Sequence, residues 1–344
     1  MRSYDGGPTD SMTKTVGHAD TPAPSLFGSV VAFNRSQSQV EVPVALALSQ
    51  NGDAWRAWTA GLPALADEFL DRWSLRLDGP PVHGAVALVL PVLQEDGSPA
   101  VLKLQPVDEE TRDEPFALRV WGARNAVELL NTAPDSGAML LERLDAARSL
   151  ATVPDATAAL QHLSELLKQL AAVPAPDGFR LLADIAGAML DRVPAYSRSL
   201  ADSSERRLLT TCAAAMRELL DEPGDRLLHW DLHYDNVLAP LPSLQVSGRA
   251  PWLAIDPKPL AGDPGFELLP ALRNRWGDVI GTADVPGAIR HRFHLMTEVV
   301  GLDRERATGW TLGRVLQDCL WDIEDGAVTL QPEPKAIAQA LLVS

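Results

Sequence analysis

The sequence predicts an α+β protein of two lobes, a small β-rich N-terminal lobe and a larger, mainly helical C-terminal lobe. Three observations predict this class. Short apolar runs bounded by turn residues fill the front of the chain, whereas apolar residues beyond Val153-Pro154-Asp155 recur at helical spacing over long segments. The chain has 344 residues, which is more than one minimal core needs. We therefore expect lobes at residues 40–144 and 145–344, joined near Leu144.

Residues 1–39 form a separate segment of the sequence. Residues 1–25 are rich in Gly, Ser, Thr, Pro and Asp and show no apolar periodicity. A segment of this composition buries too little apolar surface to offset the entropy lost on ordering. We predict a poorly ordered arm over residues 1–39.

The front lobe is predicted to hold strands, a helix and an amphipathic segment. Aromatic and aliphatic residues recur at helical spacing at Trp55, Trp58, Leu62, Leu65 and Phe69, and we expect Gly61 and Pro63 to divide this segment into two helices. A further helix is expected at Asp108–Trp121, which Pro115 must start or kink. The β-like runs are Trp73–Leu77, Ala85–Leu93, Pro99–Leu104 and Ala138–Leu144.

The back lobe is predicted to be a set of amphipathic helices. Asp155 is placed to cap a helix that runs to about Leu170. Two short strands flank the richest polar cluster of the sequence, Arg226–His229 and Trp252–Ile255. The other helices are expected at Leu181–Val193, Ser203–Asp221, Gly265–Arg275, Ala288–Val300, Arg304–Glu324 and Pro334–Leu342.

Charge and cysteine usage exclude several classes of function. The formal net charge of −16 would repel nucleic acid and anionic lipid and attract cationic ligands. Cys212 and Cys319 lie far apart without CxxC spacing, so neither a disulfide framework nor a zinc site is indicated. No apolar run resembles a signal peptide or a membrane span, and we expect a cytoplasmic protein without a membrane or nucleic-acid partner.

The strongest chemical signal is the segment His229-Trp230-Asp231-Leu232-His233-Tyr234-Asp235-Asn236. Phosphoryl transfer needs a carboxylate that orients the attacking hydroxyl and accepts its proton, and oxygen ligands for Mg²⁺. Asp231 is the candidate base, and Asn236 is a candidate metal ligand five residues later. Asp256 follows a short apolar strand and is the candidate second metal ligand. An alternative is that Asp231 and Asn236 cap turns and that Asp256 merely ends a strand.

A lysine inside an apolar strand favours the kinase interpretation. Lys103 lies in Pro99–Leu104, where its ammonium would be costly to desolvate without an anion nearby. Its predicted role is to bind the α- and β-phosphates of ATP, paired with Glu114 or Glu110 on the following helix. The alternative is a surface lysine on an edge strand. Lys103, the loop and Asp256 follow one another in the order of a protein-kinase-like two-lobed fold, although no G-x-G-x-x-G precedes Lys103.

About residues 51–342 resemble the aminoglycoside 6-phosphotransferase (streptomycin 6-kinase) and hydroxyurea phosphotransferase family. The resemblance lies in the segments Leu227–Leu238 and Trp252–Phe266, with supporting matches at Trp58–Pro63, Met139–Leu144 and Trp321–Gly326. It implies ATP and Mg²⁺ as cofactors and transfer to a hydroxyl of streptomycin, which inactivates the antibiotic. From its position after the last apolar strand of the front lobe, the hinge is expected to run through Glu142, Arg143 and Leu144, whose backbone groups would meet the adenine edge.

A guanidinylated acceptor needs carboxylates and aromatic faces. The candidates for acceptor binding are Asp263, Glu267, Trp321, Asp322, Glu324 and Asp325. The alternative is that Asp322, Glu324 and Asp325 form a solvated helix end. Lys258 is equally open to two interpretations, because it could contact a phosphate or pair with a carboxylate.

Two other functions compete with a streptomycin kinase. The first is a kinase for another small hydroxyl compound, such as hydroxyurea, an aminocyclitol or a sugar. The second is a nucleotide-binding pseudokinase, which would need neither a base nor a full set of metal ligands. The presence of Asp231, Asn236 and Asp256 together counts against the pseudokinase.

Overall fold

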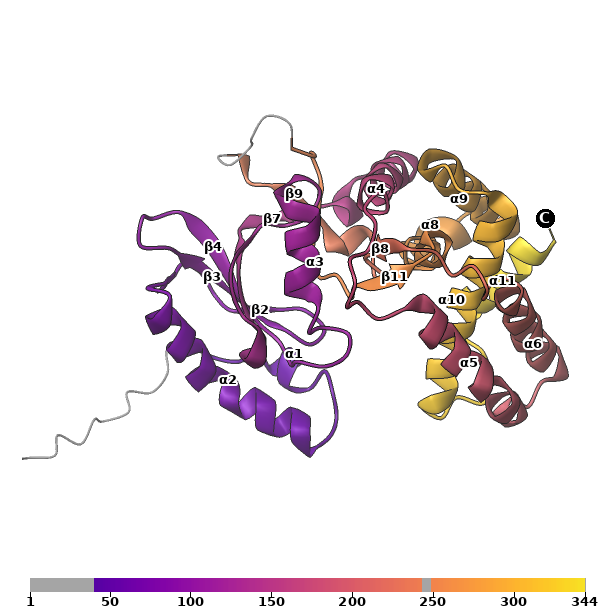
Figure 1. Cartoon of the computed structure of the whole chain (residues 1–344), viewed down its shortest axis with the longest axis horizontal. Helices are drawn as coiled ribbons and strands as arrows, with labels where there is room; N and C mark the ends of the chain where they lie inside the picture. The colour runs from indigo at the N-terminus through magenta and orange to yellow at the C-terminus, as the bar shows by residue number, and fades with distance from the viewer. Residues whose placement is uncertain (1–39, 243–248, 344) are drawn as a thin grey trace, which may run out of the picture. The chain divides into compact units, whose positions relative to one another are not determined.

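The computed structural model describes residues 40–242 and 249–343. The predicted arm at residues 1–39 lies outside the described residues. We retain residues 40–144 and 145–344 as the proposed lobes, and they are called the N-lobe and the C-lobe below. Their secondary structure has the predicted α+β character, with an antiparallel sheet followed by a larger helical part (Figure 1).

A six-stranded antiparallel sheet forms the centre of the N-lobe. Its order is β1-β3-β4-β6-β5, and β2 pairs with β3. The predicted strand at Pro99–Leu104 is β4, which lies between β3 and β6. The other strands are β1 (Arg76–Leu77), β2 (Val82–His83), β3 (Leu88–Leu93), β5 (Leu129–Ala133) and β6 (Ala138–Glu142).

Helices cover the two faces of this sheet. Helix α2 (Asp53–Arg72) follows the short α1 (Val44–Ala47) and packs against the face that carries Leu102. Helix α3 (Glu114–Trp121) lies on the face that carries Met139 (Figure 1). Side chains of a strand alternate between faces, so Lys103 points away from α2 and toward α3.

Helix α2 is continuous, so the prediction of two helices divided at Gly61 and Pro63 is wrong. A proline inside a helix costs about 3 kcal/mol. The buried stripe of α2 offsets this cost, because each large apolar side chain that leaves water contributes about 1.5–3 kcal/mol. The buried residues of this stripe are Trp55, Thr59, Leu62, Ala66 and Phe69.

Two other predicted boundaries of the N-lobe also change. The expected helix at Asp108–Trp121 begins at Glu114, with Pro115 in its first turn, where a missing N–H costs nothing. The expected strand Ala138–Leu144 is two strands, because β6 ends at Glu142 and β7 (Leu144–Ser149) pairs with β9 in another sheet. Strand β5 was not predicted, because its side chains do not alternate between buried and exposed positions and so give no period-2 pattern.

Small sheets carry the polar cluster of the C-lobe. The order of one is β10-β9-β7, and β11 pairs with β8 in the other. The strands are β8 (Arg226–Leu228), β9 (Val237–Pro240), β10 (Leu253–Ala254) and β11 (Leu260–Gly262). The predicted strands Arg226–His229 and Trp252–Ile255 therefore exist in shorter form, and β9 and β11 are their additional partners.

Helices pack around these sheets and form the rest of the C-lobe core. Asp155 caps α4 as predicted, because its carboxylate accepts hydrogen bonds from the N–H groups of Thr157 and Ala158. Helix α10 is the predicted Arg304–Glu324 and is buried along most of its length. The other helices are α4 (Ala156–Leu170), α5 (Leu182–Tyr196), α6 (Ser203–Arg217), α7 (Leu268–Arg273), α8 (Trp276–Ile280), α9 (Val285–Val300) and α11 (Pro332–Leu342). In the described ranges, no helix has both the length and the apolar character needed to cross a membrane.

Candidate active site

Two paired strands bring the candidate metal ligands together. Asn236 ends the loop between β8 and β9, and Asp256 follows β10. Strands β9 and β10 are antiparallel, and the Ile255 N–H donates to the Asn236 carbonyl oxygen over 2.9 Å. Asn236 and Asp256 therefore leave the same end of this ladder, although 20 positions separate them in the sequence.

His229 ties the loop to the strand that precedes Asp256. Its Nε2 lies 2.9 Å from the Ile255 carbonyl oxygen, and its Nδ1 lies 3.4 Å from the Asp231 amide nitrogen. Complete burial lowers the pKa of His229 to about 4, so the ring is neutral at physiological pH. A neutral ring that donates from Nε2 can accept at Nδ1, and this tautomer satisfies both contacts.

Lys103 lies between two carboxylates. Its Nζ lies 2.8 Å from both Oε1 and Oε2 of Glu114 and 2.5 Å from Oδ1 of Asp256. Burial alone would lower the pKa of Lys103, but the charges of Asp256 and Glu114 outweigh it and raise that pKa. Burial raises the pKa of Glu114, to which the Gln105 side chain also donates over 2.7 Å. The apolar strand therefore holds a charged lysine, with anions as predicted.

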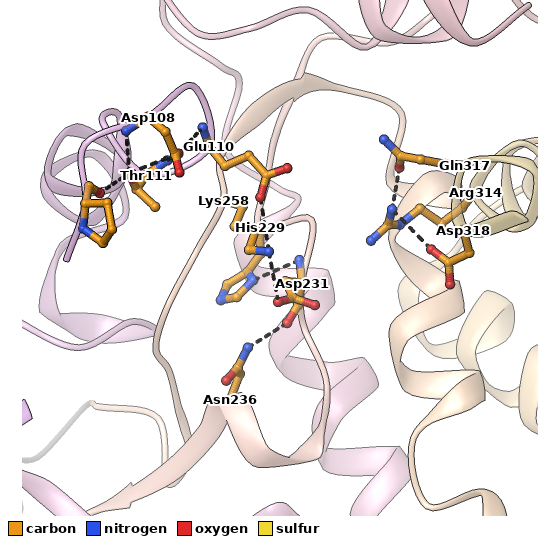
Figure 2. Close-up of polar contacts among 11 residues, drawn as sticks. Asp108, Glu110, Thr111, His229, Asp231, Asn236, Lys258, Arg314, Gln317 and Asp318 are labelled. Carbon is orange, nitrogen blue, oxygen red and sulfur yellow. Dashed lines mark hydrogen bonds and ion pairs between the residues drawn. The ribbon is translucent and has the colours of Figure 1, made fainter. Parts of the chain in front are cut away.

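The Asp231 carboxylate lies near a second lysine, Lys258 (Figure 2). The Asn236 Nδ2 donates to the Asp231 backbone oxygen over 2.9 Å, which fixes the Asp–Asn loop. Lys258 Nζ lies 3.9 Å from Oδ2 of Asp231 and 3.1 Å from Oε2 of Glu110. Glu110, the weaker candidate for the partner of Lys103, therefore pairs with Lys258 instead, and Glu114 is the carboxylate at Lys103.

These groups line one cavity of about 1120 Å³. Lys103, Glu114, Asp231, Asn236 and Asp256 all belong to its lining. The structure thus brings together the residues that the sequence singled out for base, metal and phosphate binding. A cavity of this size can hold a nucleotide and part of an acceptor, because the pockets that bind drug-sized ligands measure about 300–1,000 Å³.

Comparison with known proteins gives this arrangement a family. Residues 72–326 match the model of the aminoglycoside/hydroxyurea antibiotic resistance kinase family, which is most of the chain. The chain belongs to this family. A streptomycin 6-kinase of Streptomyces glaucescens is 55% identical over 88% of this chain and 97% of its own length. A hydroxyurea phosphotransferase of Kitasatospora aureofaciens is 49% identical over 90% of this chain and 88% of its own length.

The fold of this family member is also that of solved aminoglycoside phosphotransferases. One structure of APH(4)-Ia covers 81% of this chain and 99% of its own, with a TM-score of 0.54 at 16% identity. A ternary complex of a thermostable APH(4)-Ia mutant with ADP and hygromycin B gives a TM-score of 0.53 at 17% identity. The kinase-like two-lobed fold is therefore confirmed, and the chain is a small-molecule kinase.

The phosphate-covering loop of this kinase was not identified from the sequence. The turn between β2 and β3 lines the cavity from Gly84 to Ala87, and the Gly84 N–H donates to the Ala87 carbonyl oxygen over 3.0 Å. A Cβ at Gly84 would lie 3.7 Å from Oδ2 of Asp256. A side chain longer than alanine would therefore crowd the predicted metal ligand, and glycine at this turn was the available sequence signal.

Glu142 and Leu144, the predicted adenine hinge, are not on the cavity lining. The Glu142 N–H donates to the Glu128 carbonyl oxygen over 3.0 Å, and its carboxylate pairs with the guanidinium of Arg249. Leu144 is buried in β7, opposite Pro240 of β9. The structure thus gives Glu142 a different set of partners, and its contact with adenine stays a prediction, as does that of Leu144.

The six predicted acceptor residues also lie off the cavity lining. Glu267 is completely buried, and its carboxylate accepts the Trp230 N–H, so the prediction that it contacts an acceptor is corrected. Asp263 is buried and lies 2.6 Å from Nε of Arg306, and its contact with an acceptor stays a prediction. The others lie at the end of α10, where Trp321, Asp322, Glu324 and Asp325 follow one another within five positions.

Side chains of α10 pack against the loop that carries Trp230 and Asp231. The Arg314 guanidinium lies 5.1 Å from the Trp321 ring and 5.2 Å from the Trp230 ring, and Arg180 lies over Trp230 at 4.7 Å. Trp230 has a φ of 66°, in the left-handed region, which costs about 1–3 kcal/mol for a residue other than glycine. The contacts around the ring must offset this cost. Sequence reasoning missed Arg180 and Arg314, because an arginine in an amphipathic helix or loop gives no sign of a tryptophan partner. Trp321 thus packs against this cluster, and Glu324 pairs with Arg192 at 3.1 Å.

The donor set at Asn236 and Asp256 fits Mg²⁺. Both side chains offer hard oxygens, and the Asn236 Nδ2 is already engaged with Asp231, so the amide oxygen is the atom directed to a cation. Lys103 lowers the pKa of Asp256, against the effect of its partial burial, which keeps the carboxylate ionised. Across the described residues, no group of three or more His, Cys, Asp or Glu side chains is arranged to hold a metal. Two protein ligands suffice for Mg²⁺, which takes its remaining ligands from water and phosphate.

Proposed function

We propose that this chain is a streptomycin 6-kinase, which transfers the γ-phosphoryl group of ATP to the hydroxyl at the 6-position of streptomycin and confers resistance. The observation that carries the proposal is the convergence of Lys103, Asp231, Asn236 and Asp256 on one cavity. The acceptor is proposed from similarity, because streptomycin 6-kinases of two Streptomyces species are 55% and 50% identical over 97% and 98% of their lengths. We place the reaction in the cytoplasm, where ATP is available.

Each cavity residue has a role in this proposal. Lys103, held by Glu114, binds the α- and β-phosphates of ATP. Asn236 and Asp256 would hold Mg²⁺, which would neutralise part of the charge on the phosphate oxygens. Asp231 orients the acceptor hydroxyl and takes its proton. The acceptor oxygen forms a bond to the γ-phosphorus, the bond from that phosphorus to the bridging oxygen breaks, and ADP leaves with its electron pair.

The charge of the cavity supports a cationic acceptor. Carboxylates of Asp108, Asp135 and Asp231 line the cavity, and the whole chain has a net charge of −16. Guanidinium groups are attracted to such carboxylates and can form paired hydrogen bonds with them. A small neutral acceptor would gain nothing from this charge. A cationic aminoglycoside is therefore the acceptor class that the site favours.

A hydroxyurea kinase is the second candidate, because a hydroxyurea phosphotransferase is 49% identical over 88% of its length. A coupled assay of ADP release distinguishes the two. Streptomycin, other aminoglycosides, hydroxyurea, an aminocyclitol and simple sugars should be compared at equal concentration, with ATP and Mg²⁺ present. We expect turnover with streptomycin to exceed the others. Turnover with hydroxyurea or a sugar alone would reject the proposed acceptor, and nucleotide binding without turnover of any acceptor would favour a pseudokinase.

A further inference from the structure

Lys258 is a basic side chain at the cavity to which neither the fold nor the family comparison gives a role. It lies two positions after Asp256, between Pro257 and Pro259. The two prolines fix their own φ angles, and the Lys258 N–H donates to the His229 carbonyl oxygen over 3.0 Å. The backbone of Lys258 is therefore held beside the loop that carries Asp231, while its side chain is 38% exposed. A fixed backbone with a partly exposed ammonium suits a group that must change partners.

The ammonium of Lys258 is held near the base without being bonded to it. Nζ lies 3.1 Å from Oε2 of Glu110, within contact distance, and 3.9 Å from Oδ2 of Asp231, beyond hydrogen-bond distance (Figure 2). Glu110 belongs to the loop between β4 and α3, in the N-lobe. Both partners of this ion pair are more than one-third exposed, so solvent screens their attraction and the pair is easily exchanged.

The charges that line the cavity indicate a role for the ammonium of Lys258. Among the described residues that line the cavity, the lysine and arginine charges come from Lys103 and Lys258. Lys103 is shared between Glu114 and Asp256. A triphosphate brings several further negative charges to this site, next to the carboxylate of the base. Lys258 is the cation placed on the side of Asp231, where the γ-phosphoryl group must lie for attack by the acceptor.

We propose that Lys258 is a further catalytic residue, whose ammonium leaves Glu110 when ATP enters and neutralises the oxygens of the γ-phosphoryl group during its transfer. This rests on the proposed kinase roles of Asp231 and Asp256. Lys258 forms no covalent bond. The acceptor oxygen bonds to phosphorus, its proton passes to Asp231, and ADP takes the electrons of the broken bond. Lys258 stabilises the charge on the transferred oxygens.

A comparison of Lys258→Ala with Glu110→Gln tests the proposal, because both variants remove the same ion pair and the first alone removes the cation. We expect Lys258→Ala to lower kcat about 100-fold or more with a smaller change in KM for ATP. We expect Glu110→Gln to keep kcat within about threefold of the wild type. Lys258→Arg should recover at least about tenfold over Lys258→Ala, since it restores a cation.

Two outcomes would overturn the proposal: equal losses in Lys258→Ala and Glu110→Gln, or a Lys258→Ala kcat within about threefold of the wild type. Urea unfolding midpoints of each variant identify any loss that comes from the fold. The assay uses whichever acceptor the wild-type enzyme turns over. Lack of turnover with streptomycin therefore counts against the proposed acceptor, whereas the ratio between the variants decides the role of Lys258.

Discussion

The ammonium of Lys103 lies 2.5 Å from a carboxylate oxygen of Asp256, although 153 positions separate the two residues in the sequence. Lys103 comes from a strand of the N-lobe sheet, and Asp256 follows a strand of the C-lobe. This contact joins the predicted phosphate-binding group to a predicted metal ligand. Lys103 and Asp256 must then share their charges with ATP and Mg²⁺ when these arrive. The predictions below test that arrangement residue by residue.

Removing Glu114 should destabilise the folded enzyme. Lys103 is 3% exposed, and Glu114→Ala leaves its ammonium with Asp256 as the remaining carboxylate partner. Loss of one partner of a buried ion pair costs about 3–5 kcal/mol, and the remaining contact should reduce this to about 2–3 kcal/mol. Urea unfolding measures the change. Glu110→Ala, which breaks an exposed pair, is the control and should stay within about 0.5 kcal/mol. Equal losses in the two variants would contradict the prediction.

Replacing Asp231 should abolish most of the chemistry and spare nucleotide binding. Asp231→Asn keeps the shape of the side chain but cannot accept the acceptor's proton, so kcat should fall about 10²–10⁴-fold. The dissociation constant for ATP should stay within about threefold, because the base acts mainly in the transition state. Asp235→Asn, an exposed carboxylate of the same loop, is the control. An Asp231→Asn enzyme with wild-type kcat would remove Asp231 from the role of base.

Replacing Asp256 should remove the effect of Mg²⁺ on nucleotide affinity. Calorimetric titration with ATP, with and without Mg²⁺, should show an affinity gain for the wild type and a ratio near one for Asp256→Ala. The reason is that Asp256 supplies the charged one of two protein ligands, and Asn236 alone is a weak Mg²⁺ site. Asn236→Ala should lower the gain less. A Mg²⁺ gain in Asp256→Ala equal to that of the wild type would exclude Asp256 from the metal site.

Glu267 should make the stability of the enzyme depend on pH. Burial raises the pKa of Glu267 from 4.5 to about 7 in the folded protein. A raised pKa of this kind contributes stability that is present below about pH 4.5 and is lost as the pH rises through about 7. Glu267→Gln lacks this contribution and can still accept the Trp230 N–H through its amide oxygen.

Unfolding of the wild type and Glu267→Gln at pH 5 and pH 8 checks this prediction. The difference in unfolding free energy should shift in favour of the variant by up to about 3 kcal/mol as the pH rises. The pKa of His229 is lowered to about 4, so its contribution to stability is lost as the pH falls. This contribution is the same in both proteins and cancels in the difference. A difference that does not change with pH would contradict the assignment.

Much of the site could be predicted because its chemistry needs particular residue types in a particular order. One cavity is lined by the four residues that phosphoryl transfer requires, Lys103, Asp231, Asn236 and Asp256. The choice between Glu110 and Glu114 could not be made firmly, because both can lie on the same side of a helix. The structure separates them, because Glu114 begins α3 whereas Glu110 lies in the turn before it and pairs with Lys258.

The failed predictions have physical causes that local sequence does not reveal. Pro63 breaks an isolated helix, but the apolar stripe of α2 against the sheet outweighs it. Acidic residues near a loop suggest a cationic ligand, yet Glu267 is completely buried and accepts a backbone N–H. In each case the partner lies far away in the sequence, and tertiary contacts decide between a site residue and a supporting one.

In the proposed reaction, this enzyme phosphorylates the 6-hydroxyl of streptomycin with Asp231 as the base. Phosphorus NMR of the reaction product, with through-bond correlation to the ring protons of the acceptor, tests this reaction. We expect one phosphoester at the 6-position with the wild type, and none above background with Asp231→Asn in the same time. A phosphoester at another position, or equal product from Asp231→Asn, would contradict it.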